Sequence, residues 1–244
     1  MILMNQKSSP IKMIKIKIIT LFPELINNYL QDAMIAKAIG LNKLSVEIIN
    51  LRDFSDNPYK SVDDTPFGGG DGMLIRADIL EKALLSLKSE NKFVIYLSPQ
   101  GALLEQNFIQ KLAKIDSQDI VLICGRYAGI DQRFIETYVD QEISIGNYVL
   151  SGGELPALVL IESVVRFIPG VLGKIESAFE DSFKDNLLEA PQYTKPQVWN
   201  NQKVPDILLS GNHQKIAEWK KQMALKVTAE KRPELLKRVG KNET

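Results

Sequence analysis

The sequence predicts an α/β domain built on a parallel sheet, followed by a small all-helical C-terminal domain. Two short, largely apolar runs, FVIYLS at 93–98 and DIVLIC at 119–124, are typical of strands that are buried on both faces of a parallel sheet. Helical patterns separate the expected strands, which is the order found in α/β proteins. This alternation stops at 170–190, and the chain from about residue 205 onward has helical character.

The first part of the α/β domain begins with a strand. MIKIKIITLF at 13–22 alternates apolar residues with lysine and then becomes fully apolar, which predicts a strand that enters a core. A helix is expected over 23–40, because Pro23 suits a helix start and Gly40 suits a helix end. LSVEIINL at 44–51 predicts a second strand. Further helices are expected over 77–88, 104–114, 130–139 and 154–167.

These elements predict four segments along the chain. Residues 1–12 are expected to form a loose N-terminal extension, and 13–172 the α/β domain. Residues 173–190 are expected to form a flexible interdomain linker, since their apolar spacing is irregular and 174–189 carry five acids against two lysines. Residues 191–244 then form the helical domain, in which Ser210 or Asn212 suits a helix N-cap.

The composition places limits on the class of protein. The chain has 244 residues, of which 45% are hydrophobic, and 30 Lys and Arg balance 30 Asp and Glu, which argues against a bulk nucleic-acid binder. From residue 212 onward, however, nine Lys and Arg face four Glu, which fits either local contact with a phosphate backbone or a solvated helix face. No apolar run is long enough for a membrane span, and the start is a poor signal peptide. The single cysteine, Cys124, suits a reducing cytosol.

Four loops that are rich in glycine or small polar residues follow the expected strands. They cover 63–73, 98–104, 124–131 and 144–154. In parallel sheets, ligands bind beyond the carboxyl ends of the strands, and glycine lets the backbone approach a ligand closely. Several such loops at one sheet edge predict a site for a nucleotide-sized ligand.

The chemistry of these loops excludes several ligands. The sequence contains no P-loop motif and no G-x-G-x-x-G that opens a helix. One cysteine and one histidine cannot form a zinc cluster, and no Ser-His-Asp arrangement is present, because His213 lies next to a helix cap. A ligand with an adenosine-like part and no phosphates remains, and S-adenosylmethionine fits that description.

Eight motifs, taken together, resemble the bacterial tRNA (guanine-N1)-methyltransferase family, and the match extends from about Met13 to the end of the chain. That family methylates the guanine 3′ of the anticodon. The motifs, in chain order, are ITLFPE (19–24), DDTPFGGGDGM (63–73), YLSPQG (96–101), CGRYAGID (124–131), SIGNYVLSGGELPA (144–157), RFIPGVLG (166–173), EDSF (180–183) and LLSGNH (208–213).

The resemblance implies a SPOUT-class α/β fold with a deep trefoil knot, which spacing alone does not predict. It also implies a cytoplasmic homodimer, with S-adenosylmethionine sites at the subunit interface. The donor-binding residues that it implies are Tyr96, Leu97, Ser98, Pro99, Gly101, Gly125, Tyr127, Ser144, Ile145, Gly146, Asn147, Tyr148, Val149, Leu150, Gly152 and Gly153.

Two positions depart from the family pattern. Ala128 stands where the family usually has Glu, and Asn147 stands where it usually has Asp. Both changes remove a carboxylate near the expected donor, where the family is thought to use acids to balance the sulfonium or to place Mg²⁺, a further candidate cofactor. The backbone contacts are unaffected.

The expected chemistry needs a base at guanine N1 and a donor for the charge that grows on O6. Asp181 matches the family's base and Arg166 the residue that stabilises O6. An ordinary aspartate is a weak base, so the linker would have to fold over the guanine and exclude water. Without the resemblance, Asp181 is a solvated linker charge and Arg166 a helix-end cation.

The RNA-binding residues expected are Ser177, His213, Lys220 and Lys221. Trp199 and Trp219 suit either RNA stacking or, more typically, the core of a small helical domain. Two alternatives to the main function stay open: a SPOUT methyltransferase that acts on another RNA position, and a non-catalytic RNA-binding protein with the same fold.

Overall fold

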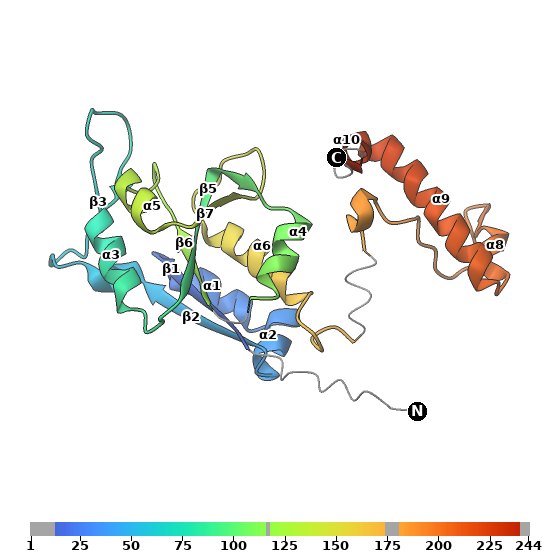
Figure 1. Cartoon of the computed structure of the whole chain (residues 1–244), viewed down its shortest axis with the longest axis horizontal. Helices are drawn as coiled ribbons and strands as arrows, with labels where there is room; N and C mark the ends of the chain where they lie inside the picture. The colour runs from blue at the N-terminus through green and yellow to red at the C-terminus, as the bar shows by residue number, and fades with distance from the viewer. Residues whose placement is uncertain (1–12, 116–117, 174–180, 240–244) are drawn as a thin grey trace, which may run out of the picture. The chain divides into compact units, whose positions relative to one another are not determined.

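The computed structural model describes residues 13–115, 118–173 and 181–239. The chain divides into two compact units, one that runs to residue 175 and one that begins at residue 176 (Figure 1). The division falls inside the segment expected to be the linker. None of the described helices is long and apolar enough to cross a membrane.

The N-terminal unit contains a five-stranded sheet in the order β2-β1-β6-β5-β7, and all its pairings are parallel (Figure 1). The strands are β1 (Ile14–Thr20), β2 (Leu44–Asn50), β5 (Lys92–Leu103), β6 (Asp119–Cys124) and β7 (Gln141–Ser144). Five of the six residues of β6 are buried, as expected for a strand covered on both faces. The predicted parallel sheet is therefore confirmed.

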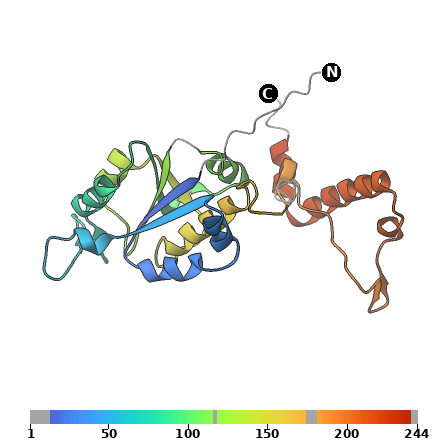
Figure 2. The same cartoon turned by 90° about the horizontal axis from the view of Figure 1, so that it is seen from below.

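Helices cover both faces of this sheet (Figure 2). They are α1 (Pro23–Leu30), α2 (Ala33–Gly40), α3 (Ala77–Ser86), α4 (Gln106–Leu112), α5 (Gln132–Tyr138) and α6 (Glu154–Val165). Apolar residues of α3 pack with Phe134 of α5 against Val121 and Ile123 of the sheet. On the other side, α6 contacts α1, α2 and α4, and it is apolar on most of its surface because it lies deep in the core.

The helix predicted over 23–40 is two helices. The break lies at Asp32, whose backbone is extended (φ −132°, ψ 168°) and whose carboxylate accepts a hydrogen bond from the Ala33 amide at 2.6 Å. A short acidic side chain competes with the helical backbone for such hydrogen bonds, so it begins a new helix rather than continuing the old one. Three short elements were also not predicted: a 3₁₀ helix (Leu51–Phe54), β3 (Asp63–Asp64) and its antiparallel partner β4 (Leu74–Ile75).

The C-terminal unit contains α8 (Asp206–Leu209), α9 (His213–Lys231), α10 (Pro233–Val239) and a short 3₁₀ helix (Lys184–Asn186). Asn212 is the N-cap of α9, because its side chain accepts a hydrogen bond from the Lys215 amide at 3.1 Å. The prediction of an all-helical domain is wrong in one respect. An antiparallel hairpin of β8 (Val198–Trp199) and β9 (Gln202–Lys203) precedes α8.

Candidate functional site

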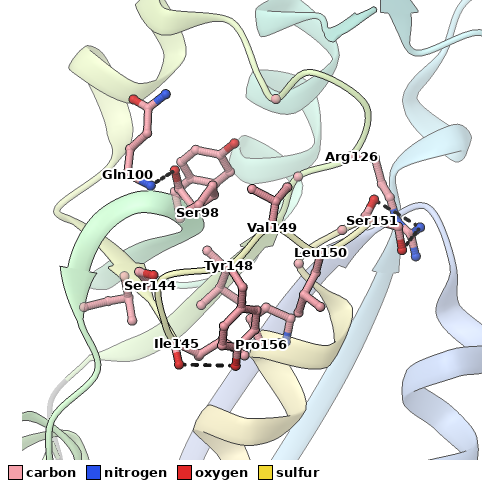
Figure 3. A pocket seen from close by; sticks show the side chains of 18 of the residues that line it. Ser98, Gln100, Arg126, Ser144, Ile145, Tyr148, Val149, Leu150, Ser151 and Pro156 are labelled. Atoms are coloured by element: carbon pink, nitrogen blue, oxygen red, sulfur yellow. Dashed lines mark hydrogen bonds between the residues drawn. The ribbon is translucent and has the colours of Figure 1, made fainter. Parts of the chain in front are cut away.

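A cavity of about 280 Å³ lies where β5, β6 and β7 end (Figure 3). Three segments line it: residues 96–100 in β5, residues 125–129 after β6, and residues 143–153 at and after β7, apart from Asn147. Pro156 in the first turn of α6 completes the wall. The cavity therefore occupies the edge of a parallel sheet at which ligands characteristically bind.

The structure brings most of the predicted donor-binding residues together around this cavity. Gly101 and Asn147 are the two that do not line it. Gly101 instead lies where β5 meets β7, and a Cβ there would be 2.3 Å from the Ile143 nitrogen. Residues of the wall that were not predicted to bind the donor are Gln100, Arg126, Ala128, Gly129, Ile143, Ser151 and Pro156. All except Gly129 and Pro156 are immediate neighbours of predicted residues, and Gly129 lies two positions beyond Tyr127 in the same loop, so reading each loop as a continuous wall would have found all but Pro156.

Local hydrogen bonds set the shape of the loop after β7. The Ser144 hydroxyl donates to the Gly146 carbonyl at 3.0 Å, and the Leu104 amide donates to the Ser144 carbonyl at 2.7 Å. The Tyr148 hydroxyl donates to the Ile145 carbonyl at 3.4 Å, as the dashed line in Figure 3 marks. The loop thus turns sharply as it leaves the sheet and then runs along the cavity.

Close contacts explain two glycines, Gly125 directly after β6 and Gly153 directly before α6. The Gly153 amide donates to the Gly125 carbonyl at 2.9 Å, and a Cβ at Gly153 would lie 2.7 Å from the Cα of Cys124. A Cβ at Gly125 would lie 2.9 Å from the ring of Tyr96. Side chains at these positions would push the two loops apart and change the width of the cavity.

Tyr96 and Cys124 are buried beside the cavity. Burial raises the pKa of Tyr96 to about 12, and the negative charge of Glu142 adds to the rise. Burial also raises the pKa of the Cys124 thiol well above its ordinary value. Near neutral pH, both groups are therefore uncharged.

Arg126 is the single charged side chain among the described residues that line the cavity. Its Nε and Nη2 atoms each lie 2.9 Å from Oε2 of Glu154, and its Nη1 donates to the Ser151 carbonyl at 3.3 Å. The guanidinium also stacks on Phe22, with its Cζ 4.2 Å from the ring centroid. Glu154 is only 1% exposed, and its other oxygen accepts from the Thr20 hydroxyl at 2.7 Å. This network ties the end of β1 to both glycine loops.

The predicted catalytic residues belong to different units. Arg166 is exposed at the C-cap of α6, in the N-terminal unit. Asp181 is half-buried in the C-terminal unit, and its carbonyl accepts from the Lys184 amide at 3.3 Å. His213 begins α9, on which Lys220 and Lys221 are also exposed. Ser177 lies outside the described residues.

The donor set of the cavity does not fit a metal site. No Asp or Glu lines it, and the described parts of the chain contain no group of three or more His, Cys, Asp or Glu that could hold a metal ion. Ala128 is part of the wall and adds only a methyl group. The residues present therefore fit a ligand held by backbone groups and apolar contacts, with little fixed charge.

Comparison with known proteins identifies relatives over nearly the full length. A family model described as tRNA (guanine-1)-methyltransferase TrmD matches residues 14–238. A tRNA (guanine-N(1)-)-methyltransferase of Clostridioides difficile (strain 630) is 47% identical over 225 residues, which are 91% of this chain and 96% of the relative. Proteins of the same name from Dictyoglomus turgidum and Marinomonas sp. (strain MWYL1) are 46% and 48% identical, over 93% and 91% of this chain and 92% and 89% of their own length.

Proposed function

Because the chain belongs to the tRNA (guanine-1)-methyltransferase family and is an enzyme of that kind, we propose that it methylates N1 of the tRNA guanine 3′ of the anticodon, with S-adenosylmethionine as the methyl donor. The observation that carries this proposal is the cavity at the ends of β5, β6 and β7. Its walls are glycine-rich, and the one charged side chain that the described residues contribute to them, Arg126, is already paired with Glu154. A donor with an adenosine part and no phosphates suits such walls.

The walls of the cavity would hold the donor chiefly through backbone groups. When bound, S-adenosylmethionine supplies an electrophilic methyl group on a sulfonium. Residues 125–129 and 145–153 offer amides and carbonyls to a nucleoside, while Leu97, Val149 and Leu150 offer apolar contact. The partly buried Arg126–Glu154 pair fixes the two loops relative to each other, so the site needs little reorganisation when the donor binds.

Asp181 and Arg166 are the residues to which we assign the proton chemistry. Guanine N1 carries a proton at neutral pH and is a poor nucleophile until that proton leaves. The Asp181 carboxylate would take the proton, and the Arg166 guanidinium would stabilise the negative charge on O6. The exposed position of Arg166 at the end of α6 supports this role, because an incoming base can reach it.

We also propose the subunit arrangement that the family resemblance implies. An exposed apolar face runs over the neighbouring helices α1 and α6, and it is formed by Phe22, Leu25, Tyr29, Leu155 and Val159. A second copy of the chain would bury this face and form a homodimer, with each active site completed by Asp181 of the other subunit. A cytoplasmic location accompanies the proposed tRNA substrate.

The trefoil knot remains part of the proposal. The segment after β7 returns to the end of β6, where Gly153 bonds to Gly125 and Gly152 forms a β-bridge with Arg126. This contact between the loop after β7 and the loop after β6 is the observation that supports the proposed knotted SPOUT arrangement. For Mg²⁺, the donor set gives no such support, and no step of the mechanism is assigned to a metal.

The C-terminal unit is proposed to bind the tRNA. His213, Lys220 and Lys221 are exposed at the start and in the middle of α9, where cations can reach a phosphate backbone. Ser177 stays a proposed contact on the basis of the resemblance alone.

The experiment that tests the function is positional mapping of the product. The purified chain is incubated with S-adenosylmethionine and an unmodified tRNA transcript, and the RNA is digested and analysed by mass spectrometry. We expect one added methyl group on the base of the guanine 3′ of the anticodon, and none when that guanine is replaced by adenine. A methyl group on a ribose or at another position would identify a different RNA methyltransferase, and binding without methyl transfer would identify a non-catalytic RNA-binding protein.

A further inference from the structure

The β8–β9 hairpin carries a tryptophan, Trp199, that is exposed and does not pack in the core. Val198 pairs with Lys203 and Trp199 with Gln202, and the turn between them consists of Asn200 and Asn201. Both asparagines have positive φ, 54° and 61°, which is the backbone of the tight turns that join paired strands. The side chain of Trp199 is 67% exposed. Of the two roles considered for Trp199, RNA stacking and a place in the core of this unit, the structure excludes the core.

Trp219, the other tryptophan of the C-terminal unit, packs against another aromatic residue. It lies on α9 and its ring centroid is 6.5 Å from that of Tyr193, so it takes part in aromatic packing within the unit. Trp199 has no such neighbour among the described aromatic residues. In Figure 2, the orange hairpin projects away from α9. Tryptophan is enriched at interfaces with partners, and the exposed ring of Trp199 is available for such a contact.

The charge around the hairpin indicates what that partner is. Residues 190–205 contain no Asp or Glu, although a quarter of the whole chain is charged. They contain Lys195 and Lys203, both exposed. The other exposed polar groups of the hairpin are the amides of Gln197, Asn200, Asn201 and Gln202. A flat ring among amides and cations, without acids, suits an unpaired base and its phosphates.

We propose that Trp199 is a stacking platform for an unpaired base of the tRNA, with Lys203 contacting the adjacent phosphate backbone. The inference rests on the proposed function, since it deepens how that substrate is held. Adjacent residues of a strand point to opposite sides of the hairpin, so Trp199 and its pair Gln202 share one face, and Val198 and Lys203 share the other. The two contacts can therefore be tested separately.

The first test is tRNA binding by the full chain and three variants. Trp199→Ala should raise the dissociation constant for tRNA about tenfold, because stacking of one base on a protein aromatic ring increases the affinity by about that factor. Trp199→Phe should retain most of the affinity, since a smaller ring can still stack. Leu85→Ala is the control, because it removes an exposed apolar side chain from α3, which belongs to neither the C-terminal unit nor the cavity wall. It should bind tRNA as the unmodified chain does.

The salt dependence of tRNA affinity separates the stacking contribution of Trp199 from the electrostatic contribution of Lys203. Lys203→Ala should lower the slope of log affinity against log salt concentration by about one, whereas Trp199→Ala should leave the slope unchanged. The affinity for S-adenosylmethionine should be the same in all variants, and circular dichroism should show that each is folded.

The second test follows the ring itself. The chain has two tryptophans, so Trp219→Phe leaves Trp199 as the only fluorescent one. Its emission should be quenched, and its accessibility to iodide reduced, when the tRNA transcript is added. If Trp199 is already shielded from iodide without RNA, and Trp199→Ala weakens self-association instead, the hairpin is a contact with a second copy and the proposal is wrong.

Unchanged emission and unchanged tRNA affinity in Trp199→Ala would also overturn the proposal. Failure of the Trp199 proposal is distinguishable from failure of the proposed function. If only the Trp199 proposal fails, the unmodified chain still methylates guanine N1 and still binds tRNA. If the proposed function fails, the unmodified chain does neither.

Discussion

Among single residues, Glu154 has the most demanding environment beside the cavity, where it holds the cavity-lining Arg126. It carries a carboxylate at 1% exposure, and its partners come from two distant parts of the chain, Thr20 and Arg126. A buried carboxylate is stable only when it is paired and hydrogen-bonded. Removing its partner therefore lowers the stability of the fold, because the charge of Glu154 would then be buried without a counter-charge. The position of both glycine loops therefore depends on Arg126.

Removing Arg126 should destabilise the fold and the donor site together. Arg126→Ala leaves the Glu154 carboxylate buried beside Thr20 alone, and the free energy of unfolding should fall by about 3 kcal/mol. The affinity for S-adenosylmethionine should fall as well, because Ser151 loses the hydrogen bonds that it accepts from the Arg126 side chain. Urea unfolding and calorimetry measure the two effects.

The matched control is Arg133→Ala, which removes an exposed arginine from its pair with Asp131. No measurable change is expected in unfolding or in donor binding, since exposed ion pairs contribute little. If Arg126→Ala behaved as Arg133→Ala does, the network would not position the loops.

Asp181 is the residue on which the proposed chemistry depends. Asp181→Asn should lower the single-turnover rate by roughly 10²–10⁴, because an amide of the same shape cannot take the N1 proton. Raising the pH should partly restore the rate, as the proton then leaves to solvent. Arg166→Ala should be slow too, but high pH should restore it less, because the missing contribution is stabilisation of charge at O6. Asp181→Asn within a few-fold of the unmodified chain would place the base elsewhere.

At the scale of secondary-structure elements, the buried strands were the easiest to predict. DIVLIC at 119–124 matches β6 residue for residue, since a strand covered on both faces is apolar throughout. The break at Asp32 was not predicted, because the apolar spacing continues across it and only the side-chain hydrogen bond to Ala33 reveals it. The β8–β9 hairpin was also missed, since each strand is two residues long and has no apolar pattern.

In the candidate site, too, features with a local sequence pattern were predictable and long-range contacts were not. The loops were predictable because glycine and small residues recur after successive strands. The Arg126–Glu154 pair was not, because the two residues are separated by 28 positions and meet only when the loop after β7 returns to β6. Local patterns thus locate the cavity, whereas the contacts that fix its shape come from the tertiary fold.

Gly101 tests the link between the sheet and the cavity. A Cβ at this position would lie 2.3 Å from the nitrogen of Ile143 and 2.4 Å from the carbonyl carbon of Glu142, both backbone atoms. Gly101→Ala should therefore separate β5 from β7, lower the free energy of unfolding by about 1–3 kcal/mol and weaken donor binding. Thermal unfolding and donor titration would measure both.

Gly40→Ala is the control for that substitution. Gly40 is the last residue of α2, and a Cβ there would meet nothing within 4 Å. The change should leave donor binding as it is and raise the free energy of unfolding by up to about 1 kcal/mol, since alanine favours a helix more than glycine does. Equal effects at Gly101 and Gly40 would mean that the β5–β7 contact is not a tight one.

At the scale of the whole molecule, the proposed catalytic residues are divided between two units, with Arg166 in one and Asp181 in the other. The exposed apolar residues of α1 and α6 are the surface that we propose a second copy covers. A shared active site connects these observations, because each site would then use the donor cavity of one subunit and Asp181 of its partner.

Mixed dimers test the shared site. A chain with Asp181→Ala and a chain with Leu150→Trp, which enlarges a side chain of the cavity wall, should each be inactive as homodimers. When differently tagged copies are mixed and heterodimers are purified, partial activity should return, because one of the two sites then has both an intact cavity and Asp181. Heterodimers as inactive as both parents, beside an active unmodified dimer prepared in the same way, would show that each subunit works alone.

The central claim is that the cavity formed by residues 96–100, 125–129 and 143–153 holds S-adenosylmethionine, and calorimetric titration of the full chain with this donor alone tests it most directly. We expect saturable binding without tRNA, because all three segments belong to the folded N-terminal unit. Leu150→Trp should abolish the heat of binding. Leu85→Trp, at an exposed position on α3 outside the cavity, should retain it. No heat at millimolar donor from the folded, unmodified chain, or equal binding by Leu150→Trp, would contradict the account.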